Sequence, residues 1–100
     1  MKRAETYREM AARMRRRIAS DLFAPPAIAG VIHEAASLGY RRYRIIQAHP
    51  FDLSGTEAAQ ALERWLMEEQ FRYVWRTTYV EGDPLRPASG TEYPELEIRW

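Results

Sequence analysis

Apolar residues recur at intervals of three and four along the first quarter of the chain, and this spacing predicts an amphipathic helix from residue 4 to residue 22. The residues on its apolar side are Tyr7, Met10, Ala11, Met14, Ile18 and Leu22. Arg13, Arg16 and Arg17 fall on the opposite side. We expect the helix to end at Pro25-Pro26, because a proline lacks the amide proton and disfavours α geometry in the residue before it.

A second helix is expected to begin at Pro26, a residue suited to the first helical position. Its apolar positions are Ile28, Val31, Ile32, Ala35 and Leu38. Gly39 is suited to end it as a left-handed cap. Residues 40–47 then alternate, with Tyr43 and Ile45 on one face and Arg42 and Arg44 on the other, which predicts a strand with one face in solvent.

A third helix is expected after the connector that contains His49 and Asp52, because Ser54 and Glu57 have the spacing of a capping box. The positions expected to be buried in this helix are Ala58, Ala61, Leu62, Trp65 and Leu66. Those expected to face solvent are Glu57, Gln60, Glu63, Arg64 and Glu68.

Two further strands are predicted near the end of the chain, separated by a turn-rich loop at residues 81–92. In the first strand, residues 71–80, Tyr73, Trp75 and Tyr79 share one face. In the last strand, Leu96, Ile98 and Trp100 alternate with Glu95, Glu97 and Arg99. If the two strands pair antiparallel, Arg72 and Arg76 are expected to lie across from Glu95 and Glu97, which favours this register.

The expected fold is therefore α+β, with the order α-α-β-α-β-β and a three-stranded sheet covered on one face by helices. A right-handed β-α-β crossover followed by a hairpin is the simplest topology. The length of 100 residues fits a single domain at 1–100, made of a basic amphipathic helix at 1–24 and an α/β core at 25–100.

Composition narrows the class of protein without assigning a function. Hydrophobic residues make up 46% and charged residues 29%, which are ordinary values for a globular protein. No apolar run is long enough to span a membrane, and the charged start after Met1 argues against a secretory signal, so a cytoplasmic location is expected. There is no cysteine, which excludes disulfides, thiolate metal sites and cysteine nucleophiles.

Charge is distributed unevenly, although the net charge is only +1. Residues 1–24 contain seven basic and three acidic residues, a balance of +4, which leaves −3 for the remainder. The residues that would contact a polyanion such as nucleic acid are Arg8, Arg13, Arg15, Arg16 and Arg17. The same helix can instead face solvent or a protein, and its candidate interface residues are Tyr7, Met10, Met14 and Ile18, because methionine-rich faces suit adaptable interfaces.

A second basic patch is expected on the solvent face of the sheet, formed by Arg42, Arg44, Arg72, Arg76 and Arg99. Proteins that bind single-stranded RNA on a sheet add aromatic residues to such a face, and here Tyr40 is the main aromatic residue in phase with the arginines. A mixed-charge solvent face is the simpler interpretation. The three tryptophans are in phase with the predicted core, which favours packing over a ligand cage.

Catalytic signatures are missing from the sequence. His33 and His49 lack the spacing of a metal pair, and His49 with Asp52 resembles a base and its orienting acid only in residue type. No phosphate-binding glycine loop or paired carboxylate motif is present. We therefore expect neither catalytic activity, nor a cofactor, nor a metal.

The pattern of elements resembles many small phage and prophage proteins of unassigned function. The features that carry this resemblance are the charged first helix, the turn at Leu38-Gly39-Tyr40, the next helix, and a closing strand that ends in Ile98-Arg99-Trp100. Some proteins of this type are virion or accessory components. The resemblance implies no functional residue, and the long loop at 81–94 departs from the tight hairpin common among them.

The sequence thus favours a non-enzymatic protein that takes part in protein-protein interaction or assembly. Its partner would be another protein or a second copy of the chain, with the first helix and the loop at 81–92 as contact surfaces. The alternative is a nucleic-acid-binding accessory protein that acts through the arginine-rich first helix. The two hypotheses differ in their response to salt, because contacts with a phosphate backbone weaken steeply as salt rises.

Overall fold

The computed structural model describes residues 2–79 and 92–100, and within them it has the α+β architecture and element order that the sequence predicts. The helices are α1 (Arg3–Leu22), α2 (Pro25–Ser37) and α3 (Glu57–Glu68). The strands are β1 (Arg42–Arg44), β2 (Arg72–Tyr79) and β3 (Glu92–Arg99). The predicted loop at 81–92 lies outside the described residues except for Glu92.

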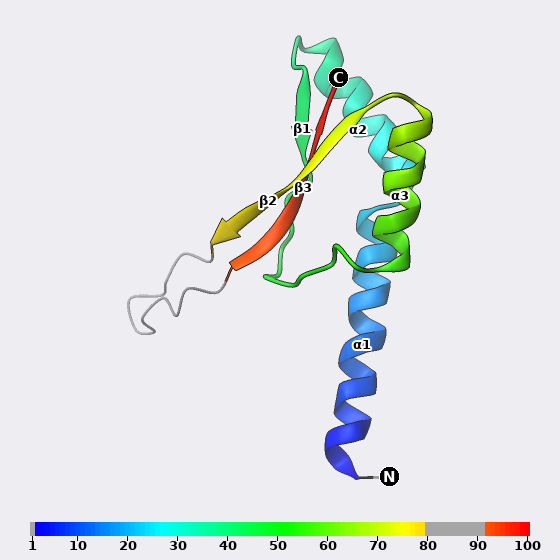
Figure 1. Ribbon diagram of the computed structural model, residues 1–100, viewed down its shortest axis with the longest axis vertical. Helices are drawn as coiled ribbons and strands as arrows, with labels where there is room; N and C mark the ends of the chain where they lie inside the picture. The colour runs from blue at the N-terminus through cyan, green and yellow to red at the C-terminus, as the bar shows by residue number, and fades with distance from the viewer. Residues whose placement is uncertain (1, 80–91) are drawn as a thin grey trace.

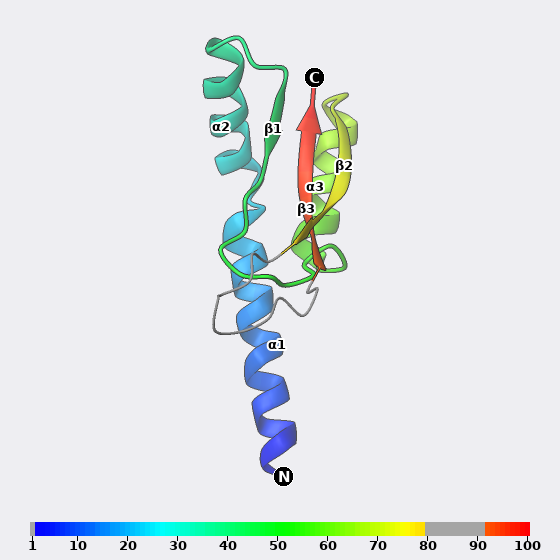
Figure 2. The ribbon, with the colours of Figure 1, turned by 90° about the vertical axis from the view of Figure 1, so that its left-hand side faces the viewer.

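The three strands form one sheet in the order β1-β3-β2, with β3 antiparallel to both of its neighbours. Consequently β1 and β2 run in the same direction, and α3 connects them across the last strand of the chain. Figures 1 and 2 show the helices gathered on one side of this sheet. Within residues 2–79 and 92–100, the other face of the sheet carries no helix (Figures 1 and 2).

The register of β2 and β3 confirms one of the two predicted charge pairings. Arg76 lies opposite Glu95, as expected, but Arg72 lies opposite Arg99 and not opposite a glutamate. On the other side of β3, Arg42 also lies opposite Arg99. The register therefore places three arginines in one row across the sheet, an arrangement that the sequence-based pairing did not anticipate.

Strand β1 is shorter than the predicted strand at 40–47, and the contacts of Glu95 and Pro94 explain why. After Arg44 one more backbone bond forms, from the Ile45 amide to the Leu96 carbonyl over 2.9 Å. The amide of Gln47 instead donates to Oε2 of Glu95 over 2.7 Å. Pro94 has no amide proton to offer at this level of β3, so the ladder cannot continue.

The core lies between the helix-facing side of the sheet and the helices. Its largest fully buried side chains are Phe23, Leu53, Leu62, Leu66, Leu96 and Ile98. Within α1 only Ala19 is buried, so this helix joins the core through its last turns. The three tryptophans pack against the core as partly buried residues, as the sequence predicts.

The packing of α3 corrects several predicted positions. Leu62 and Leu66 are buried as expected, but Ala59 takes the buried position that was assigned to Ala61, which is exposed. Glu63 was expected in solvent and is instead partly buried. Its carboxylate accepts hydrogen bonds from the Tyr73 hydroxyl over 3.1 Å and from the indole nitrogen of Trp75 over 3.0 Å, which ties α3 to β2.

One predicted helix end is correct and another is wrong. Gly39 has a φ of 96°, the left-handed geometry expected of the residue after α2. The predicted cap of α3 at Ser54 is wrong, because Thr56 is the cap and its hydroxyl accepts the amide of Ala59 over 3.2 Å. Ser54 donates its amide and its hydroxyl to Asp52 in the preceding turn.

Replacing Leu62 with alanine should lower the free energy of unfolding by about 2–5 kcal/mol, because this side chain is fully buried and its loss leaves a cavity. Urea denaturation monitored by tryptophan fluorescence measures the change. Met67→Ala on the exposed side of the same helix is the matched control and should change stability by less than about 0.5 kcal/mol. Equal losses in both variants would contradict the packing described here.

Candidate interaction surfaces

The first half of α1 extends away from the rest of the molecule. Figure 1 shows the helix projecting beyond the sheet and α3, with its N-terminus at the far end. Residues 2–17 are exposed apart from Ala12, and packing against the core begins at Ile18. About four turns of helix are therefore presented to solvent on most sides.

Three of the four candidate interface residues lie on this projecting half. Tyr7, Met10 and Met14 keep 63%, 55% and 53% of their surface exposed. Ile18 is partly buried and packs at the edge of the core. Because these residues follow one another at intervals of three and four, they form a single line along the helix, which we call the apolar stripe (Tyr7, Met10, Met14 and Ile18).

The apolar stripe leads into a shallow groove of about 430 Å³ between the end of α1 and the chain that follows β1. The groove is lined by Ile18, Asp21, Leu22, Ile46, Gln47, Ala48, His49 and Leu53. Ile46 keeps 76% of its surface exposed, the highest value among the large apolar residues that the structure describes as exposed. Since Ile18 belongs to both features, the stripe and the groove form one continuous apolar surface.

The five candidate polyanion-binding arginines of α1 do not form one face. Arg8 and Arg15 are two turns apart and share one side of the helix, whereas Arg13, Arg16 and Arg17 share a different side, because each residue turns the helix by about 100°. The guanidinium carbon of Arg15 lies 4.8 Å from the centre of the Phe51 ring, a cation-π contact with the connector. All five side chains are nevertheless exposed.

The outer face of the sheet brings its predicted arginines together around two buried carboxylates. Glu95 and Glu97 are only 4% and 6% exposed, although they lie on the side without helices. Three ion pairs cover them: Arg44 with Glu95 at 3.1 Å, and Arg76 and Arg99 with Glu97 at 2.8 and 2.9 Å. The long arginine side chains thus form the cover that a layer of helices would otherwise supply.

Glu95 connects all three strand regions of this face. Besides Arg44, its carboxylate accepts the amide of Gln47 over 2.7 Å and the hydroxyl of Thr78 over 3.2 Å. Arg44 also donates to the hydroxyl of Thr78. A carboxylate with this many donors stays buried at low cost, because its lost hydration is replaced by hydrogen bonds.

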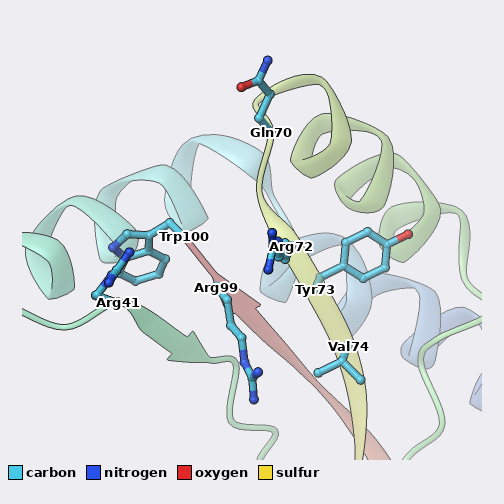
Figure 3. Close-up of a pocket in the computed structure, with 7 residues that line it drawn as sticks. All are labelled: Arg41, Gln70, Arg72, Tyr73, Val74, Arg99 and Trp100. Carbon is cyan, nitrogen blue, oxygen red and sulfur yellow. The ribbon is translucent and has the colours of Figure 1, made fainter.

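The arginine row (Arg42, Arg99 and Arg72) crosses the three strands at one end of the outer face. Among residues 2–79 and 92–100, no carboxylate lies within 4 Å of Arg42 or Arg72. A hollow of about 600 Å³ on the β2 side is lined by Arg41, Gln70, Arg72, Tyr73, Val74, Arg99 and Trp100 (Figure 3). A second, of about 560 Å³, is lined by Tyr40, Arg42, Arg44, Arg76 and Glu97.

The predicted histidine candidates are not brought into a catalytic arrangement. His49 stacks on Phe51 with ring centres 5.5 Å apart, and the carboxylate of Asp52 accepts from Ser54 and not from the histidine. In the part of the chain that the structure describes, no group of three potential metal ligands is found. None of the described helices is both long and apolar enough to cross a bilayer.

Sequence reasoning located both basic surfaces but missed the residues that organise them. Ile46 was read as part of a strand, and its exposure next to α1 depends on where β1 ends. Glu97 was expected to face solvent. It is buried because β3 is the central strand of the sheet and the side chains of Arg76 and Arg99 lie over it. The alternation of charged residues (Glu95, Glu97 and Arg99) with apolar ones was the available signal for this network.

Glu97 should make stability dependent on acid pH. The hydrogen bond from Arg76 holds the pKa of Glu97 below its ordinary value of 4.5 despite burial, and the bond from Arg99 adds to the effect. Folding therefore favours the ionised form, and the resulting stability is complete above pH 4.5 and is lost as the pH falls toward the lower pKa of the folded state.

Glu97→Gln should therefore reduce stability near neutral pH and flatten the decline below pH 4.5. Urea midpoints measured from pH 3 to pH 7 give both slopes, with the exposed Glu68→Gln as the control, which should retain the wild-type decline. A wild-type slope in Glu97→Gln would show that the Arg76-Glu97-Arg99 network contributes nothing to acid sensitivity.

Comparisons with known proteins assign no family. A scan against protein-family models finds no match, and searches of curated proteins and of solved structures also find no similar chain. The resemblance to small phage and prophage proteins stays a prediction from the sequence pattern. Any functional conclusion therefore depends on the surfaces described above.

Proposed function

We propose that this is a non-enzymatic assembly protein that associates with a second copy of itself through the apolar stripe of α1. The observation that carries the proposal is the projecting half of α1, with Tyr7, Met10 and Met14 more than half exposed. The groove beside Ile46 extends the same apolar surface onto the body of the protein. Such a surface is typical of a protein-protein interface.

A helix that projects from its domain has a physical reason to pair. Isolated helices of 12–15 residues are marginally stable in water, because few tertiary contacts offset the cost of ordering them. The described residues before Ile18 contribute almost no packing of their own. Burying an apolar side against a partner helix would stabilise this segment, and methionine adapts readily to such contacts.

Charge and spacing favour a second copy in antiparallel orientation. If Met10 of one copy lies level with Met14 of the other, the two-fold axis passes near Ala12. Arg3 then lies level with Asp21 of the partner, and both residues are on the same side of the helix because they are five turns apart. Tyr7 lies level with Arg17 of the partner, a pairing suited to a cation-π contact.

The same arrangement fills the groove at the end of α1. Asp21 lines this groove, so the N-terminal turn of the partner helix would lie along it near Ile46. A two-fold interface of this kind is self-complementary, since each contact occurs twice. Parallel pairing would instead place Arg3 beside Arg3 and leave the groove without a partner.

A phage origin is part of this proposal and follows only from the pattern of elements. A small α+β protein with an exposed pairing helix suits assembly roles of the kind found among virion or accessory components. The protein would then be a building unit whose contacts depend on the stripe and not on a catalytic site.

The alternative is a nucleic-acid-binding accessory protein that acts through α1. In its favour, Arg8, Arg13, Arg16 and Arg17 are exposed and have no carboxylate within 4 Å among the described residues. Against it, Arg8 lies on a different side of the helix from Arg13, Arg16 and Arg17, so the four do not give a single contact face. An α1-dependent interaction that weakens steeply with salt would favour this alternative.

Met10→Gln with Met14→Gln should convert the dimer to a monomer, because the two residues form the centre of the apolar stripe. Size-exclusion chromatography with light scattering at 50 mM and 500 mM salt measures the oligomer, which should persist at high salt in the wild type. The control is Arg13→Gln with Arg16→Gln, which introduces the same residues on the other side of α1 and should leave the dimer intact. A monomeric wild type, or a dimer that survives the methionine substitutions, would refute the proposal.

Charge exchange tests the orientation of the helices. Arg3→Asp alone and Asp21→Arg alone should each weaken the dimer a few-fold at low salt, because each places like charges side by side at an exposed site. The combined variant restores opposite charges in an antiparallel pair and should recover wild-type affinity. Sedimentation equilibrium gives the dissociation constants. Single variants with wild-type affinity would indicate parallel pairing, because each exchange would then only replace one pair of like charges with another.

A further inference from the structure

We propose that the outer face of the sheet binds the sugar-phosphate backbone of a single-stranded nucleic acid through the arginine row and the two hollows beside it. This inference does not rest on the α1 dimer. It also differs from the helix-based alternative, because it assigns binding to arginines of the strands. The occupant follows from the charge balance of the face, the two hollows that cross it and the exposed ring of Tyr40.

The arginine row is an arrangement that an anion would stabilise. Arg42 and Arg72 both lie directly opposite Arg99, on strands spaced about 4.8 Å apart. Like charges at directly opposed positions destabilise a sheet. A phosphate placed over the row would replace this repulsion with attraction, and guanidinium groups can hold phosphate oxygens with two hydrogen bonds each.

Positive charge remains on this face after its internal ion pairs have formed. The five arginines of the patch are set against Glu95 and Glu97, which leaves three positive charges. Arg42 and Arg72 are exposed and lack a carboxylate within 4 Å among the described residues. These side chains are available to a ligand without breaking an existing pair.

The shape of the face suits a chain better than a small anion. The hollow of about 600 Å³ contains Arg72 and Arg99, and the hollow of about 560 Å³ contains Arg42 and Arg44. Each hollow is lined by residues from both flanks of β3 and from β3 itself, so together they form a basic track that crosses the strands at the arginine row.

An exposed aromatic ring beside the arginine row favours unpaired bases. Tyr40, which keeps 62% of its surface exposed, lines the second hollow together with Arg42 and Arg44. Bases of a single strand stack on such a ring, whereas bases inside a duplex are covered by their neighbours. An acidic peptide would satisfy the arginines but would leave this ring without a flat partner.

The test is fluorescence anisotropy with a labelled 20-nucleotide single-stranded DNA of mixed sequence, titrated with the full chain at 50–200 mM salt. Arg42→Gln with Arg72→Gln should weaken binding about ten-fold. The slope of log affinity against log salt should fall by about 1.4, because each lost phosphate contact removes about 0.7. Arg13→Gln with Arg16→Gln removes the same charge from α1 and should leave both quantities unchanged.

The aromatic contact has its own pair of variants. Tyr40→Ala should weaken oligonucleotide binding about five-fold, because base stacking on the ring is lost. Tyr79→Ala removes a similarly exposed ring from the helix-facing side of the sheet and should have no effect. Thermal melts followed by circular dichroism should show that all variants remain folded, since every substituted side chain is exposed.

Four results would overturn the proposal. These are failure of the wild type to bind the oligonucleotide at 50 mM salt, equal affinity in the Arg42-Arg72 variant, an equal loss in the α1 variant, and equally tight binding of a poly-glutamate peptide of the same charge. Loss of binding confined to the sheet variants, with weaker binding of the peptide and of a duplex made by annealing the same oligonucleotide to its complement, is the result that the proposal expects.

Discussion

The burial of Glu95 and Glu97 on the side of the sheet without helices is the constraint on which the rest of this face depends. A buried carboxylate is costly unless opposite charges and hydrogen bonds replace its water. Arg44, Arg76 and Arg99 supply those charges, and their side chains lie flat over β3 as a result. Arg42 and Arg72, the other two arginines of this face, form no ion pair with a carboxylate within the described residues. This network therefore covers the centre of the sheet. It also distinguishes the arginines that hold Glu95 and Glu97 from Arg42 and Arg72, which can contact a ligand.

The other constraint is the uneven distribution of apolar packing along α1. Ala19 and the following Phe23 are buried, whereas nearly everything before Ile18 is exposed. A single helix therefore combines an anchored end with an end whose apolar side has no covering within the described chain. The assembly proposal explains this division by a second copy, and the sheet proposal explains the charge on the opposite part of the molecule, so the two surfaces can act independently.

The element order and most helix faces could be predicted, because periodicity of three to four or of two is a local property of the sequence. Gly39 and the apolar spacing of α1 and α3 are examples. What could not be predicted depends on residues far apart in the chain. The length of β1 depends on Pro94 and Glu95, and the burial of Glu63 depends on Tyr73 and Trp75. Ser54 failed as a cap because Asp52, two residues earlier, holds its amide and hydroxyl.

The sequence indicated which elements carry each candidate surface, but it did not indicate all of the residues that come together there. The residues of the apolar stripe are adjacent in the sequence pattern, whereas Ile46 belongs to another element and joins Ile18 in the groove only in three dimensions. The sheet patch contained the correct five arginines, yet the row of Arg42, Arg99 and Arg72 requires the strand order β1-β3-β2, which no local pattern specifies.

The unbroken helix α1 also defines a fixed distance and rotation between its two ends. Because it continues from the projecting half into the core without interruption, its length would fix the separation between two cores joined through their stripes, at about 1.5 Å for every residue. Its pitch would fix their relative rotation, since one inserted residue turns everything beyond it by about 100°. The spacing and mutual orientation of two arginine-bearing sheets would then be encoded in the residue count of one helix.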